Sequence, residues 1–190
     1  MKLLIDGDIV CYRCGFAAER ALYTVTDGFG QTEEFDYKKE VDKYIKESGQ
    51  PLDSFTIEKD KVIEPLEYAL KNVRTVLEAI QERFESNDMT VYLSGKDNFR
   101  DFLANILPYK GNRDPDHKPV HYEEIVRYIC ENYHTIICDG AEADDALAID
   151  QTNNSIIVST DKDLDQIPGQ HFNWVSDEIY TIEGCFGYRY

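Results

Sequence analysis

Three short apolar runs in this 190-residue chain each lead into a cluster of acidic residues, and this pattern most limits what the chain can fold into. The runs are Lys2–Ile5, Thr135–Cys138 and Ser155–Ser159. Short apolar runs bounded by polar turns are typical of buried strands. The acids that follow the three runs are, in order, Asp6 and Asp8; Glu142, Asp144 and Asp145; and Asp161, Asp163 and Asp165.

Segments with helical spacing separate these runs. Between residues 64 and 84, apolar residues recur every three or four positions, at Leu66, Ala69, Leu70, Val73, Leu77 and Ile80. We also expect helices over 9–20, 37–48, 120–132 and 142–149, and strands over 90–93 and 172–175. Strands that alternate with helices predict an α/β fold with a mostly parallel central sheet and helices on both faces.

The stretch near 21–60 departs from this alternation. Two alternating segments flank Asp27-Gly28-Phe29-Gly30, which is a hairpin signal, and a polar helical segment follows. We therefore expect a β-hairpin-plus-helix insertion. The length suits one domain and no repeat or linker interrupts it, so residues 1–190 are predicted to form a single domain.

The composition excludes several classes of protein. No apolar run approaches the roughly 18 residues of a membrane helix, and we expect a cytoplasmic protein without a membrane partner. Cys11 and Cys14 form a C-x-x-C, but the odd number of cysteines, five, favours buried thiols over a disulfide framework. With a net charge of −17, the chain can attract nucleic acid only through bound cations or a local basic patch.

The acidic clusters are candidates for such bound cations. The carboxyl ends of neighbouring parallel strands meet at one edge of a sheet, where ligands of α/β proteins bind. Crowded carboxylates raise each other's pKa, and a hard divalent cation such as Mg²⁺ or Mn²⁺ removes that conflict. An alternative stays open for each cluster: Asp144 and Asp145 can cap a helix, and Asp161 and Asp163 can form an Asx-turn.

A basic segment complements the acids. Tyr109-Lys110-Gly111-Asn112-Arg113 lies between Arg100 and Lys118. Its lysine and arginine can grip a phosphate while the tyrosine stacks on a base, although a solvated loop has the same composition.

Four motifs in this order resemble the flap-endonuclease (5′-nuclease) superfamily, and most of all its phage 5′–3′ exonucleases, whose fold is similar to PIN domains. They are Ile5-Asp6-Gly7-Asp8, Tyr109-Lys110-Gly111-Asn112-Arg113, Glu142-Ala143-Asp144-Asp145 and Ser159-Thr160-Asp161-Lys162-Asp163. The resemblance covers roughly residues 1–20 and 90–175. It implies a divalent-metal-dependent 5′ nuclease acting on DNA with a 5′ end or a branch, located in the host cytoplasm if the chain is phage-encoded.

The resemblance also implies roles for individual residues. Two Mg²⁺ or Mn²⁺ ions are expected on Asp6, Asp8, Glu142, Asp144, Asp145, Asp161 and Asp163. Lys110 is expected to contact the scissile phosphate with Arg113 beside it, Tyr109 to lie near the terminal nucleotide, and Arg100 to add a nucleic-acid contact.

Two departures from the family pattern stand out. Where the family has an acid after the strand before the basic segment, this chain has Ser94-Gly95, with Asp97 two residues further on. The family's later Gly-Asp…Asp-Asn segment and its DNA-gripping helical hairpin do not occur among the 190 residues. Three explanations stay open: a separately encoded second half, a homo-oligomer, or a divergent activity.

Two other functions remain open from the sequence. Leu3-Leu4-Ile5-Asp6-Gly7-Asp8 also fits haloacid-dehalogenase-like phosphatases, with Asp6 as nucleophile, Asp8 as acid/base and Ser94 as phosphate holder. The other alternative is a non-catalytic, nuclease-like subunit that binds nucleic acid or a partner chain.

Overall fold

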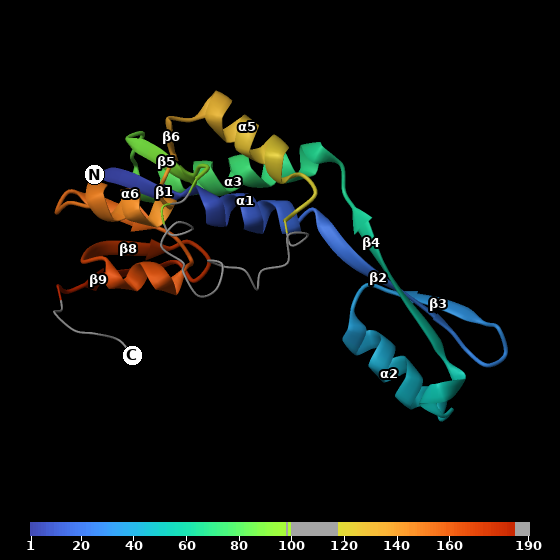
Figure 1. Cartoon of the computed structure of the whole chain (residues 1–190). Coiled ribbons are helices and arrows are strands. Elements are labelled where there is room, and N and C mark those ends of the chain that lie inside the picture. The colour runs from blue at the N-terminus through green and yellow to red at the C-terminus, as the bar shows by residue number, and fades with distance from the viewer. Residues whose placement is uncertain (98, 100–117, 185–190) are drawn as a thin grey trace.

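A six-stranded sheet forms the centre of the molecule (Figure 1). The computed structural model describes residues 1–97, 99 and 118–184. The strands are β1 (Lys2–Asp6), β5 (Met89–Ser94), β6 (Thr135–Cys138), β7 (Ser155–Val158), β8 (Gly169–Asn173) and β9 (Glu178–Ile182). Their order is β6-β5-β1-β7-β8-β9, and only the last pair is antiparallel. The predicted α/β fold with a mostly parallel sheet is confirmed.

The sheet carries a hydrophobic core on each face. Leu3 and Ile5 of β1 point to one face, which is covered by α1 (Gly7–Phe16), α3 (Leu66–Phe84) and α5 (Tyr122–Asn132). Leu4 points to the other face and packs under α6 (Ala143–Asp150) and the 3₁₀ turn Lys162–Gln166. All three β1 side chains are fully buried, as expected for a central parallel strand covered on both sides. None of the helices in the described ranges is long and apolar enough to cross a membrane.

An arm extends away from the sheet between α1 and α3 (Figure 1). It consists of β2 (Glu19–Thr26), β3 (Thr32–Phe35), α2 (Lys38–Ser48), a 3₁₀ turn (Leu52–Ser54) and β4 (Thr56–Ile63). The predicted hairpin and helix are present, but the prediction missed β4, which pairs along the whole of β2. Nearly every residue of β4 is exposed, so the strand has no apolar face for sequence periodicity to reveal.

The arm has its own small core and a fixed base. Val25, Val41 and Ile45 are buried together between its sheet and α2. At the base, the carboxylate of Glu19 contacts Lys61 Nζ at 2.8 Å and accepts a hydrogen bond from Val120 N at 2.6 Å. The arm is therefore joined to the segment that leads into α5.

Helix α1 begins earlier than predicted because Asp6 caps it. The Asp6 side chain accepts a hydrogen bond from Ile9 N at 3.2 Å, which places the first helical residue at Gly7 rather than at residue 9. The buried Cys11 and Cys14 lie on this helix, and burial raises the pKa of Cys14 to about 11. Both cysteines thus contribute to the core as thiols.

Gly7 is required for the close approach of α1 to β5. A Cβ atom at this position would lie 2.6 Å from the Tyr92 carbonyl oxygen and 2.7 Å from a Val91 methyl carbon. We expect Gly7→Ala to lower the free energy of unfolding by about 2 kcal/mol or more, in the range of overpacked cores. Urea denaturation followed by circular dichroism measures the change. Gly28→Ala is the control, because its nearest neighbour would lie 3.5 Å away, and an equal loss in both variants would contradict the argument.

Candidate functional site

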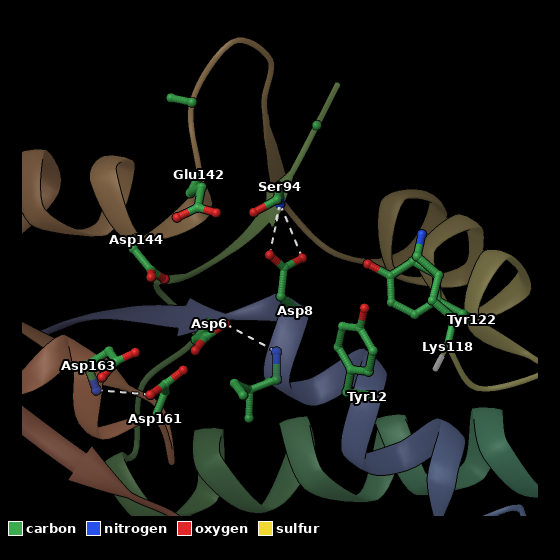
Figure 2. A pocket seen from close by; sticks show the side chains of 13 residues that line it. Asp6, Asp8, Tyr12, Ser94, Lys118, Tyr122, Glu142, Asp144, Asp161 and Asp163 are labelled. Atoms are coloured by element: carbon green, nitrogen blue, oxygen red, sulfur yellow. Dashed lines mark hydrogen bonds between the residues drawn. The ribbon is translucent and has the colours of Figure 1, made fainter. Parts of the chain in front are cut away.

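A pocket of about 480 Å³ opens at the carboxyl ends of the parallel strands (Figure 2). Six of the seven predicted metal ligands line it: Asp6, Asp8, Glu142, Asp144, Asp161 and Asp163. The seventh, Asp145, lines an adjoining pocket together with Glu142, Asp144 and Asp163. Sheet order explains the gathering, since β1 and β7 are neighbours and β5 alone separates β1 from β6.

Asp6 is the most buried acid of the pocket, with 2% of its surface exposed. Its Oδ2 accepts a hydrogen bond from Ser159 Oγ at 2.6 Å, and its Oδ1 accepts one from Ile9 N. Burial raises the pKa of Asp6 to about 7; the two hydrogen bonds lower it, and the charges of Asp8 and Asp144 raise it further. In the absence of a cation, the Asp6 carboxyl therefore titrates near neutral pH.

Asp8 and Ser94 connect two helices. Ser94 N donates to both carboxylate oxygens of Asp8, at 3.1 and 3.3 Å, and Ser94 Oγ accepts a hydrogen bond from Ala143 N at 3.0 Å. Ser94 thus connects the first turn of α1 to the first turn of α6. Asp97 does not line this pocket within the described part of the chain.

The acids that precede and begin α6 have a structural role. Asp145 Oδ2 accepts a hydrogen bond from Glu142 N at 3.1 Å, and the two residues form a capping box. The capping alternative therefore holds for Asp145, while Asp144 points into the pocket (Figure 2).

The Asx-turn alternative also holds for the cluster after β7. Asp161 Oδ1 accepts a hydrogen bond from Asp163 N at 2.9 Å. Ser159 Oγ accepts one from Asp161 N at 2.9 Å while it donates to Asp6. The sequence motif contained Ser159, but nothing in the sequence predicted its hydrogen bond to Asp6. These contacts leave each carboxylate further lone pairs, so capping and metal binding are compatible.

The opposite wall of the pocket is aromatic and basic. Lys118 was named from the sequence as a flank of the basic segment, but the two tyrosines were not identified. The rings of Tyr12 and Tyr122 lie 5.2 Å apart, and Lys118 Nζ lies 4.4 Å from the centre of the Tyr122 ring. All three residues line the pocket (Figure 2). Because Tyr12 and Tyr122 come from α1 and α5, no local spacing in the sequence could reveal their meeting. The predicted contacts Arg100, Tyr109, Lys110 and Arg113 lie outside the described residues.

The donor chemistry of the pocket fits a hard divalent cation. Its six carboxylates supply oxygen ligands only, which Mg²⁺ and Mn²⁺ prefer. Within residues 1–97, 99 and 118–184, no group of three or more His, Cys, Asp or Glu side chains has the arrangement of a formed metal site. The carboxylates share a pocket but would have to turn toward a common ion.

Comparison with known proteins gives a match in structure but none in sequence. No protein-family model and no curated protein sequence matches the chain. The 5′-exonuclease of bacteriophage T5 with bound zinc matches 95% of this chain and 57% of its own, with a TM-score of 0.54 and 15% identity. This chain has a 5′-nuclease-like fold.

A second match supports the 5′-nuclease-like fold. The flap endonuclease of bacteriophage T5, in a pseudo-enzyme–product complex with DNA and metal ions, matches 94% of this chain and 57% of its own, with a TM-score of 0.52 and 16% identity. The chain thus spans a little over half the length of these structures. The resemblance inferred from the four motifs is confirmed at the level of the fold.

The geometry disfavours the phosphatase hypothesis. A nucleophilic carboxylate has to reach the phosphorus atom, but Asp6 is 2% exposed and both of its oxygens accept hydrogen bonds. In the 5′-nuclease-like fold Asp6 instead forms the floor of the pocket.

We expect Asp6→Asn to stabilise the metal-free protein more strongly as the pH rises from about 4 to about 8. The pKa of Asp6 is about 7 in the folded chain against an ordinary 3.8, so the folded state retains a proton that the unfolded state releases between these values. The charge of Asp6 therefore does not affect the free energy of unfolding below a pH of 3.8, and above a pH of about 7 it lowers this free energy by roughly 4 kcal/mol. The neutral asparagine avoids this loss.

Urea unfolding of both proteins with a chelator, at several pH values, measures this difference. Asparagine keeps the helix cap but places an amide N–H group instead of an acceptor oxygen opposite Ser159 Oγ. That difference does not depend on pH, so the change of the stability difference with pH reports the Asp6 charge. A stability difference that does not change with pH would contradict the raised pKa.

Proposed function

We propose that the protein is a divalent-metal-dependent 5′ nuclease, of the 5′–3′ exonuclease or flap endonuclease type, that hydrolyses phosphodiester bonds in DNA. The observation that carries the proposal is the gathering of six carboxylates from three strand ends in one pocket of a 5′-nuclease-like fold. The similar bacteriophage T5 structures contain divalent metal ions, and one contains DNA, which supports the choice of cofactor and substrate.

The acids of the pocket would hold Mg²⁺ or Mn²⁺, which we propose as two ions. Asp6 anchors the floor, Asp8, Glu142 and Asp144 approach from α1 and α6, and Asp161 and Asp163 approach from the loop after β7. When bound, such ions make water acidic and offset the negative charge of the phosphate. Asp145, which lines the adjoining pocket, would support the same cluster.

Basic residues would orient the phosphate. We propose Lys110 and Arg113 as the residues that contact the scissile phosphate, with Tyr109 and Arg100 as further nucleic-acid contacts. Lys118 brings a positive charge into the same pocket, which supports an approach of the substrate from this side. Because the chain has a net charge of −17, these residues and the cations have to supply the attraction for DNA locally. A companion chain or a second copy would extend the DNA contacts.

The proposal is tested by titrating Mg²⁺ or Mn²⁺ against a labelled DNA with a 5′ end. Asp144→Ala/Asp145→Ala should lower the rate by at least about 100-fold, because both changes remove proposed ligands or their support. Glu40→Ala/Asp42→Ala on α2 removes the same charge from exposed positions of the arm and should leave the rate unchanged.

Two outcomes would overturn this function. Cleavage without a divalent ion, or cleavage indifferent to Asp144→Ala/Asp145→Ala, would reject the metal mechanism. Absence of cleavage together with absence of stoichiometric Mn²⁺ uptake in calorimetry would instead support the non-catalytic, nuclease-like subunit.

A further inference from the structure

Lys118 stands at the far end of the pocket from the acids after β7. Figure 2 shows Asp161 and Asp163 on one side, Asp6 and Asp8 between, and Tyr12, Tyr122 and Lys118 on the other side. The pocket is therefore divided into an acidic end and an aromatic, cationic end.

The backbone that carries Lys118 is held in place from two directions. Pro119 packs directly on Gly15 of α1, where a Cβ atom would come within 2.5 Å of the proline ring. Val120 N donates a hydrogen bond to Glu19 Oε1 at 2.6 Å, and the Glu19 side chain is only 6% exposed. The position of Lys118 at the pocket is thus set by α1 and by the base of the arm.

Among the residues that the structure describes, the ammonium group of Lys118 contacts the face of Tyr122, at 4.4 Å, and Glu123 Oε1, at 3.8 Å. The ion pair with Glu123 is exposed on both sides, so it is weak and easily exchanged. An ammonium group has three donors, so contacts with one ring face and one carboxylate leave it the capacity to donate to a phosphate oxygen.

We propose that Lys118, supported by Tyr122, binds a second phosphate of the nucleic-acid strand, next to the phosphate that is cleaved at the acidic end. The inference rests on the proposed function and deepens it, because it makes the pocket a site for two consecutive phosphates. A pocket of about 480 Å³ is large enough for such a ligand, since pockets for small ligands span roughly 300–1,000 Å³.

The test compares two substrates that differ in the second phosphate. One is a labelled single-stranded DNA oligonucleotide, and the other is bis(p-nitrophenyl) phosphate, which has a single phosphodiester. Lys118→Ala should reduce kcat/KM about tenfold more for the oligonucleotide than for the small diester, through KM rather than kcat. It should also reduce the slope of log affinity against log salt by about 0.7.

Two further variants complete the design. Lys118→Arg keeps the charge and should restore most of the oligonucleotide affinity. Lys71→Ala removes an exposed lysine of α3 and should leave kcat/KM unchanged for both substrates. Oligonucleotide affinity is also measured by fluorescence anisotropy with Ca²⁺, so the result does not depend on cleavage.

The possible failures are distinguishable. Equal losses of kcat/KM for both substrates, or an unchanged oligonucleotide affinity in Lys118→Ala, would overturn the second phosphate site while leaving the nuclease in place. Cleavage of neither substrate by the wild-type protein would overturn the proposed function, and the binding measurement with Ca²⁺ would then still decide the role of Lys118.

Discussion

The hydrogen bond between Ser159 and Asp6 is the contact on which the rest of the site depends. It joins the ends of β1 and β7, which are neighbours in the sheet, at a distance of 2.6 Å. From Asp6 the network continues to the first turn of α1, and from Ser159 it continues to Asp161 and the turn that carries Asp163. Because Asp6 and Ser159 are both buried, this bond fixes the loop after β7 relative to α1, and with it the spacing of the acids.

The acids are tolerated because they are placed where backbone N–H groups point at them. Asp6, Glu142 and Asp161 stand at the N-caps of α1, α6 and the 3₁₀ turn, and Asp8 and Asp144 follow in the first turns. A carboxylate at a helix N-terminus typically gains 0.3–1 kcal/mol from the helix dipole, less than the cost of burying Asp6. The local structure thus offsets part of the repulsion between the acids. Under the proposed function, a bound cation would neutralise the remainder, and the same side chains would cap the helices and bind the ion.

The features that follow from the order of strands and helices were predictable from the sequence. Strand ends followed by acids placed six of the seven candidate ligands in one pocket, and the alternation of elements predicted the parallel sheet. Two strands were missed, β4 and β9, because both lie at sheet edges and expose most of their side chains. The meeting of Tyr12, Tyr122 and Lys118 was missed for another reason: it depends on the packing of α1 against α5, which no spacing within either helix encodes.

The acidic and cationic ends of the pocket come from different parts of the fold. The acidic end is built from residues that follow strand termini, so the sheet sets its charge. At the other end, Tyr12 and Tyr122 come from helices that pack on one face of that sheet, and Lys118 comes from the segment before α5. A phosphodiester chain carries one negative charge per nucleotide, and a protein with a net charge of −17 needs bound cations or basic side chains where the phosphates lie. Divalent ions at the acidic end and Lys118 at the other would supply these charges. Under the proposed function, the direction in which a nucleic-acid strand would cross the pocket would be set by the contacts of Gly15 with Pro119 and of Val120 with Glu19, which hold Lys118 relative to α1.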